Sequence, residues 1–177
     1  MALREILTFP NPRLNERAEP VEGVDDEIRT LIEDMFETMY DSEGVGLAAP
    51  QVGVLKRIIV VDCGEREGDE SAPLQPVQPI AVVNPEVEEA EGKITWKEGC
   101  LSIPGFTDDV ERAAEVVVTG LDRDGNPLRI EATGLLAVCL QHEIDHLEGT
   151  LFVDRLSRLK QTLVKKRLKR KAAEAVA

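Results

Sequence analysis

Both histidines of this 177-residue chain lie in one short segment, Gln141-His142-Glu143-Ile144-Asp145-His146. Apolar residues around the segment predict a helix over 135–147, and Gly149 is a suitable C-terminal cap for it. Residues four apart lie on one face of a helix, so both imidazoles can reach the same divalent cation. Glu143 projects from nearly the same face and can exchange a proton with water there without being a ligand.

A helical histidine pair can also be an ordinary part of a protein core. This helix is otherwise apolar, however, and burying two imidazoles and a carboxylate in it is costly unless something pairs with them. Metal binding is therefore the better interpretation. Zinc proteases with the His-Glu-x-x-His pattern need a third ligand, but Phe152 stands where one class has a histidine, and residues 150–173 contain no glutamate for the other class. The sequence thus argues against a protease.

Three widely spaced cysteines are the remaining sources of a third ligand, and their number does not indicate a disulfide framework. Cys63 ends an expected buried strand and is most simply a packing residue. Cys139 lies on the same helix face as His142, but one turn too early to join both histidines around one ion without strain. Cys100, within Glu98-Gly99-Cys100-Leu101-Ser102, follows a strand and can point its thiolate at a site. Cys100 is favoured and Cys139 is its rival; one thiolate and two imidazoles leave a fourth position open, as in catalytic sites.

A third segment, Gly44-Val45-Gly46-Leu47-Ala48-Ala49-Pro50-Gln51, contains two closely spaced glycines. Glycines permit a ligand to approach the backbone closely, although a plain tight turn is the simpler interpretation. A phosphate loop is excluded because no Lys-Ser/Thr pair follows.

The expected fold is α+β: mixed, mostly antiparallel sheets packed around the central metal-binding helix, with a C-terminal helix. A first helix is expected at 25–41, capped by Asp25, and a polar surface loop at 64–79. The expected strands are 58–61, 80–83, 86–97, 114–122, 127–132 and a short one at 151–153, with a hairpin turn at 122–126. The helix from Ser157 onward is expected to be amphipathic, with one apolar side formed by Leu156, Leu159, Leu163 and Val164.

The charge is distributed unevenly along the chain. From Arg155 to Ala177 there are nine Lys or Arg against one acid, a net charge of +8, whereas the rest has 12 basic against 33 acidic residues, a net charge of −21. The acidic body argues against a DNA-binding fold and leaves a local contact of the basic tail open. No apolar run is long enough for a bilayer, and no apolar signal core is found, so a cytoplasmic protein without membrane contact is expected.

Three segments together resemble the peptide deformylase family. Gly44 to Gln51 matches the family's Gly-x-Gly-x-Ala-Ala-x-Gln, residues 98–102 match Glu-Gly-Cys-Leu-Ser, and residues 141–146 match Gln-His-Glu-x-Asp-His. Order and spacing agree over nearly the whole chain. The resemblance implies a metal-dependent hydrolase that removes the formyl group from the N-terminal formyl-methionine of nascent polypeptides.

The resemblance also implies the roles of individual residues. Cys100, His142 and His146 are expected to hold one divalent ion per chain, ferrous iron as in bacterial members, with zinc, nickel or cobalt as substitutes. Water or hydroxide on that ion attacks the formyl carbonyl, and Glu143 acts as general base and then as acid. Arg112 is expected to pair with Glu98 or Asp145 and so to orient a histidine, with ordinary ion pairs as the alternative.

The remaining implied residues stabilise the oxyanion and bind the peptide. The Gln51 side chain and the Leu101 backbone N–H stabilise the oxyanion, each such donor being worth ~3 kcal/mol of barrier. Gly46 pairs its backbone with the peptide, and the methionine side chain enters an apolar pocket. The expected substrate-binding residues are Gly44, Val45, Gly46, Leu135, Val138 and Cys139.

The chain is expected to form one domain, with a catalytic part at 1–156 and the basic helix at 157–177. In bacterial members of the family such a tail helix can dock on the ribosome, and the +8 tail suits that partner. The alternative is a non-catalytic protein with a structural metal that reaches the ribosome or RNA through this tail. Glu143 separates the two hypotheses, because a structural site has no use for a carboxylate beside its ligands.

Overall fold

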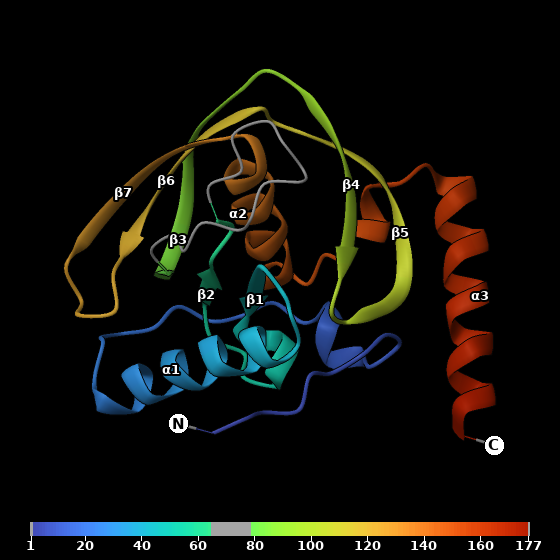
Figure 1. Ribbon diagram of the computed structural model, residues 1–177, viewed down its shortest axis with the longest axis horizontal. Helices are drawn as coiled ribbons and strands as arrows, with labels where there is room; N and C mark the ends of the chain where they lie inside the picture. The colour runs from blue at the N-terminus through green and yellow to red at the C-terminus, as the bar shows by residue number, and fades with distance from the viewer. Residues whose placement is uncertain (1, 65–78, 177) are drawn as a thin grey trace.

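The computed structural model describes residues 2–64 and 79–176, and its architecture is the expected α+β class (Figure 1). Its helices are α1 (Asp26–Asp41), α2 (Gly134–Leu147) and α3 (Arg158–Val176), and its short 3-10 turns are η1 (Pro12–Asn15), η2 (Ala49–Val52) and η3 (Phe152–Arg155). Its strands are β1 (Gly46–Ala48), β2 (Ile58–Val61), β3 (Ile80–Glu91), β4 (Ile94–Cys100), β5 (Ile103–Arg112), β6 (Glu115–Leu121) and β7 (Pro127–Thr133).

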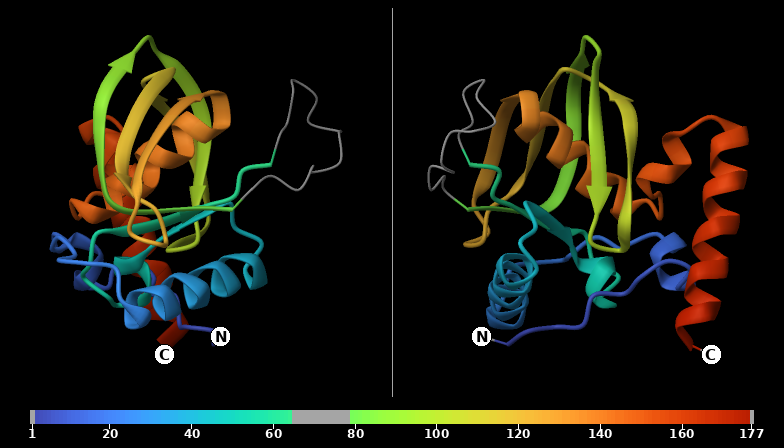
Figure 2. Two further views of the ribbon diagram at one scale, coloured as in Figure 1. Left: turned by 90° about the vertical axis from the view of Figure 1, so that its left-hand side faces the viewer. Right: turned by 45° about the vertical axis from the view of Figure 1, so that its right-hand side comes forward.

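The strands form a five-stranded sheet of order β1-β2-β3-β6-β7 and a two-stranded sheet of β4 and β5, and all pairs between named strands are antiparallel. The long strand β3 changes register after Val83, so its first half pairs with β2 and its second half with β6. This bend curves the sheet around α2, which lies inside the fold in Figures 1 and 2.

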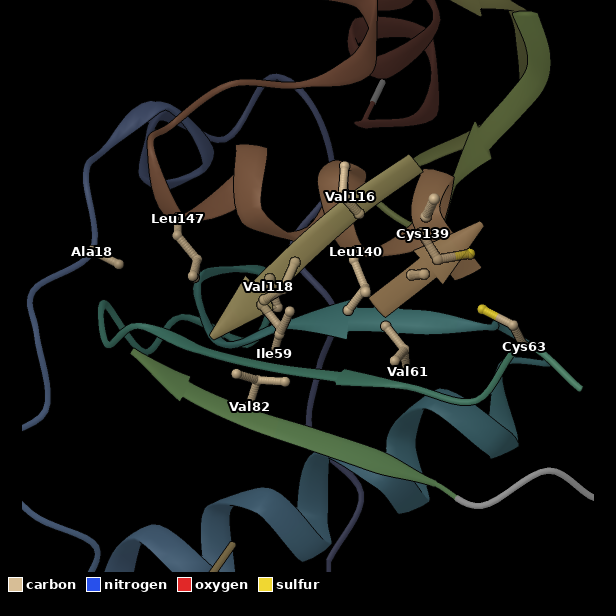
Figure 3. Packing of buried hydrophobic residues seen from close by; sticks show 13 residues of the cluster. Ala18, Ile59, Val61, Cys63, Val82, Val116, Val118, Cys139, Leu140 and Leu147 are labelled. Carbon is tan, nitrogen blue, oxygen red and sulfur yellow. The ribbon is translucent and has the colours of Figure 1, made fainter. Parts of the chain in front are cut away.

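Strand β2 explains why α2 is buried. Its run Ile58-Ile59-Val60-Val61 is fully buried, because side chains of a strand alternate between faces and both faces are covered here. Ile59 and Val61 pack toward α2, as Figure 3 shows, whereas Ile58 and Val60 pack in a second cluster with α1. The central helix thus lies in an apolar layer in which every polar group needs a partner.

Several expected elements are confirmed and others are wrong. Helix α1 begins where predicted, and the Asp25 side chain accepts a hydrogen bond from Ile28 N at 2.9 Å. The expected strand at 86–97 is instead the end of β3, a turn at Gly92, and the start of β4. The expected short strand at 151–153 is wrong, because these residues lead into the 3-10 turn η3. Strands β1 and β5 were not expected, and residues 65–78 of the predicted 64–79 loop lie outside the described residues.

Helix α3 lies along the outer side of β5 (Figure 1). Val164 and Leu168 pack against a cluster that contains Phe152 and Leu156. Leu159 and Leu163 were expected on the packed side of the helix. This prediction is wrong, because the two residues are 70% and 59% exposed. Among the described residues, none of the helices is both long and apolar enough to cross a membrane.

Candidate metal centre and cavity

Cys100, His142 and His146 come together at the centre of the fold, from the end of β4 and from α2. The Cys100 Sγ lies 3.4 Å from the His146 Nε2, which is 3.2 Å from the His142 Nε2. All three ligand atoms lie within 4.8 Å of one another. The register of β4 and β5 shifts between Gly99, which pairs with Thr107, and Cys100, which pairs with Ile103, so the ladder is irregular where Cys100 lies.

These groups fit a single divalent ion chemically. A thiolate with two imidazoles is a ligand set for iron, cobalt, nickel or zinc, with a fourth position left for substrate or water. Burial by itself lowers the pKa of His142, but hydrogen bonds to Cys100 and Glu98 outweigh it and raise that pKa to about 10. Burial lowers the pKa of His146 well below its usual value. Because thiol and imidazole ligands must be deprotonated to bind an ion, binding weakens as the pH falls.

A network of charged side chains binds the Nδ1 side of the His142 ring. The Glu98 Oε1 lies 2.8 Å from the His142 Nδ1, and both Glu98 oxygens accept hydrogen bonds from Arg112, at 2.5 and 2.8 Å. Arg112 also donates to Asp145 at 2.9 Å, so it pairs with both expected acids rather than one. Burial raises the pKa of Glu98, but the hydrogen bonds from His142 and Arg112 more than offset this and hold it below its usual range. Glu98 is therefore an anion that fixes the ring tautomer of His142.

Glu143 is a buried carboxylate beside the cluster. Its Oε2 has no hydrogen-bond partner among the described residues, and burial raises its pKa to about 7. Gly46 explains how the carboxylate fits: a Cβ at that position would lie 2.7 Å from the Glu143 Oε1. A Cβ at Gly44 would lie 2.8 Å from Leu101 Cδ1. The two glycines thus permit close packing of site side chains, whereas the sequence suggested only a ligand or a turn.

Gln51 extends from the short turn η2 toward the same point. Its Oε1 accepts a hydrogen bond from Ala48 N at 2.9 Å, which fixes the side-chain amide so that Nε2 faces Ser102 Oγ at 3.0 Å and Cys100 Sγ at 3.5 Å. Ser102 is fully buried and was not expected at the site. The amide N–H groups of Gln51 are therefore held beside the Cys100 sulfur.

A cavity of about 470 Å³ opens beside this centre. Its lining includes every expected site residue except His146, which lies deeper. The opposite wall comes from β4 and β5, through Trp96, Phe106 and Thr107, and was not expected because the β5 sequence has no clear alternation. The cavity gives a peptide-sized ligand access to Cys100, His142 and Glu143.

Cys139 lines the cavity but does not join the ligand cluster. Figure 3 shows its sulfur close to that of Cys63. A hydrogen bond with Cys63, together with burial, raises the pKa of Cys139 well above its usual value, so Cys139 is a neutral thiol. The geometry therefore favours Cys100 over its rival as the third ligand.

Comparison with known proteins gives a consistent result over nearly the whole chain. The model of the polypeptide deformylase family matches residues 3–162. A peptide deformylase of Alkalilimnicola ehrlichii is 54% identical over 170 residues, which cover 96% of this chain and 91% of that relative. The crystal structure of peptide deformylase from Ehrlichia chaffeensis in complex with actinonin has a TM-score of 0.86 and 45% identity, covering 97% of this chain and 98% of that one. A Met-Ala-Ser-bound class I type b peptide deformylase from Acinetobacter baumannii has a TM-score of 0.81 and 34% identity, covering 88% and 99%.

Proposed function

The chain belongs to the polypeptide deformylase family, and we propose that it removes the formyl group from the N-terminal formyl-methionine of nascent polypeptides. The observation that carries this proposal is the Cys100, His142 and His146 cluster beside Glu143, whose Oε2 has no hydrogen-bond partner among the described residues, with a cavity that reaches Cys100, His142 and Glu143. Hydrolysis of a small amide needs a polarised carbonyl, a proton acceptor and donors for the oxyanion, and each has a candidate here.

Cys100, His142 and His146 would hold the ion, which we take to be ferrous iron, with zinc, nickel or cobalt as substitutes. When bound, such an ion polarises a carbonyl and lowers the pKa of water toward neutrality. The protein's part is to keep both imidazoles oriented and the thiolate in place. The Glu98 carboxylate does this for His142 by binding Nδ1, so that Nε2 remains directed at the cluster.

Glu143 would move the proton. Its free Oε2 accepts a proton from the attacking water and then delivers it to the departing amine nitrogen. Such acid and base catalysis typically contributes about 10²–10⁴-fold to the rate. The close packing of Gly46 on the other oxygen holds the carboxylate in place for both transfers.

Gln51 and Leu101 would stabilise the oxyanion through the Gln51 Nε2 and the Leu101 backbone N–H. The Gln51 amide is already fixed by Ala48 N, so little reorganisation is needed when charge develops on the substrate oxygen. Ser102 holds the same amide from the other side.

The apolar part of the cavity would take the methionine side chain. Val45, Leu135, Val138 and Cys139 supply small and aliphatic surface, which suits a flexible thioether. Gly44 and Gly46 would border the peptide backbone, with Gly46 pairing with it. The Met-Ala-Ser peptide bound to the Acinetobacter baumannii relative is consistent with a peptide that begins with methionine.

The basic helix α3 would be the contact to the ribosome, and it would belong to one domain with residues 1–156. Its exposed cations include Lys166, Lys169 and Arg170. Such a contact would place the enzyme in the cytoplasm, where nascent chains emerge. A variant with all three cations replaced by Glu should lose salt-sensitive co-sedimentation with ribosomes; unchanged co-sedimentation of a folded variant would contradict the docking.

The direct test of the activity uses protein purified without oxygen and loaded with ferrous iron or nickel. We expect formate release from formyl-Met-Ala-Ser, loss of the activity with a chelator, recovery on reloading, and intact peptide bonds in the product. Acetyl-Met-Ala-Ser is the matched control, because it differs only by a methyl group at the reacting carbonyl. No formate release from a protein that holds one metal per chain would contradict the proposal.

A further inference from the structure

Arg155 lies at the end of η3, outside every segment that suggested the active site. Its guanidinium binds the Asp145 carboxylate through two hydrogen bonds, Nη2 to Oδ1 at 2.6 Å and Nε to Oδ2 at 3.0 Å. This paired geometry is specific to arginine and fixes the orientation of a carboxylate plane. The Arg155 side chain is 50% exposed, whereas that of Asp145 is 12% exposed, so Arg155 covers the acid from the solvent side.

Asp145 connects Arg155 to the buried side chain of Arg112. Its Oδ2 accepts from Arg155 and also from Arg112, whose side chain is only 3% exposed. The other N–H groups of Arg112 hold both oxygens of Glu98, and Glu98 holds the Nδ1 of His142. A continuous series of hydrogen bonds therefore runs from the protein surface to a metal-binding histidine.

Arg155 supplies a second cation to this series, beside Arg112. Arg112 and Arg155 are two cations, and Glu98 and Asp145 are two anions. Without Arg155, Arg112 alone would be shared between two buried carboxylates, and Asp145 would keep one side-chain hydrogen bond among the described residues. An uncompensated buried charge is costly, so the remaining groups would rearrange or admit water.

Space for that water is already present. A cavity of about 380 Å³ shares no lining residue with the substrate cavity, and its lining includes the polar side chains of Lys93, Gln141, Arg112, Asp145 and Arg155. Removing the Arg155 side chain would widen this cavity directly onto the Arg112–Glu98 pair. Water there would weaken the pair by screening it, and Glu98 would hold the His142 ring less firmly.

We infer that Arg155 is a positioning residue of the metal centre, which acts through Asp145, Arg112 and Glu98 to hold His142 in its metal-binding orientation. This inference rests on the proposed function, because it assumes that the cluster binds a metal for catalysis. It concerns orientation and not substrate contact, so Arg155 should affect metal affinity and kcat while leaving KM nearly unchanged.

The test compares wild type with Arg155→Ala, Arg155→Lys and Arg158→Ala. Arg158 is the matched control, because it is an exposed arginine three residues further along, at the start of α3. Metal-free proteins are titrated with Co²⁺ against a chelator, and the visible absorption of the Co²⁺ forms is recorded. The kcat and KM for formyl-Met-Ala-Ser and the thermal midpoint of each metal-free protein are then measured.

We expect Arg155→Ala to bind Co²⁺ about 10–100-fold more weakly, with altered absorption bands, a similarly lowered kcat and a KM within about twofold. Arg155→Lys keeps the charge but not the paired hydrogen bonds, so it should lie between Arg155→Ala and wild type. Arg158→Ala should equal wild type. If Arg155→Ala does not fold, Arg155→Lys alone decides the matter.

Cobalt affinity and absorption within about twofold of wild type in Arg155→Ala would overturn the inference, even if its thermal midpoint falls. So would an Arg155→Lys protein that binds Co²⁺ as wild type does. Failure of the proposed function is seen separately, because the wild-type protein would then bind Co²⁺ yet release no formate.

Discussion

Helices α2 and α3 differ in which side chains they bury and which they leave exposed. Helix α2 buries His142, Glu143, Asp145 and His146 in the centre of the protein, whereas α3 leaves Leu159 and Leu163 exposed among its cations. Burying charge in α2 is possible because Glu98 pairs with His142 and Arg112 pairs with Asp145. An exposed leucine costs less folding free energy than an uncompensated buried charge, and Leu159 and Leu163 contribute little to the stability of the fold. The contrast separates residues of the proposed site, which are buried and paired, from leucines that the fold leaves exposed.

The largest effect on metal binding and activity should come from removing the Cys100 thiolate from the cluster of Cys100, His142 and His146. Cys100→Ala leaves two imidazoles, which are too few to hold the ion against a chelator, so we expect neither stoichiometric metal nor formate release. Cys63→Ala is the control, because Cys63 is equally a free cysteine but lies outside the ligand cluster. Metal analysis of both proteins after dialysis checks this; a Cys100→Ala protein with one ion per chain would show that the third ligand lies elsewhere.

Breaking the buried charges behind α2 should cost the most stability. Arg112→Met leaves Glu98 and Asp145 without their buried cation, which typically costs about 3–5 kcal/mol of unfolding free energy. Urea unfolding of the metal-free protein measures this without any contribution from the ion. Arg129→Ala, which breaks an exposed pair with Glu131, should leave the urea midpoint unchanged. Equal midpoints in the two variants would contradict the difference between buried and exposed charge.

A methyl group at Gly46 tests how tightly Glu143 is held. The new Cβ would lie 2.7 Å from the Glu143 Oε1, so the carboxylate must shift. A displacement of about 1 Å at a catalytic group can cost about 100-fold in rate, and we expect Gly46→Ala to lose kcat on that order while keeping its metal. Gly23→Ala is the control, because nothing lies within 4 Å of a Cβ there. Full activity of Gly46→Ala would show that Glu143 has room to move.

The smallest effect should come from the exposed face of α3. Replacing Leu159 and Leu163 by Ser should change the unfolding free energy by no more than about 0.5 kcal/mol for each residue and leave peptide turnover unchanged. Val164→Ser, on the packed side of the same helix, should destabilise the protein measurably. Denaturation curves compare the two proteins. If the leucine variant is the less stable one, the assignment of the two faces is wrong.

The sequence predicted well the elements whose signals are local. The apolar spacing and Asp25 cap of α1, the alternation-free buried run of β2 and the Asp122–Asn126 turn all depend on neighbours in the chain. Strand β5 was missed because Pro104 and Gly105 interrupt its pattern, and it is a strand only through its pairing with β4. Apolar spacing alone also could not show which side of α3 packs, since that depends on the position of η3 and β5.

The candidate site divides in the same way. The His142, Glu143 and His146 arrangement follows from helix spacing, and so it could be predicted from the residues themselves. The sequence favoured Cys100 and left Cys139 as its rival, whereas the approach of the end of β4 to α2, which brings Cys100 to both histidines, is a tertiary contact that no pattern reveals. Arg155 was not predicted because it meets Asp145 only after the chain turns at Gly149 and η3. Residues joined by tertiary contacts alone leave no periodic signal.

The variant Glu143→Gln distinguishes a role of Glu143 in turnover, which we propose, from a role in metal binding. We expect the variant to retain one nickel or cobalt ion per chain while formate release from formyl-Met-Ala-Ser falls about 10³-fold. Glu148→Gln, at the exposed end of the same helix, is the control and should keep wild-type turnover. Undiminished formate release from Glu143→Gln, or loss of the ion together with the activity, would contradict the account.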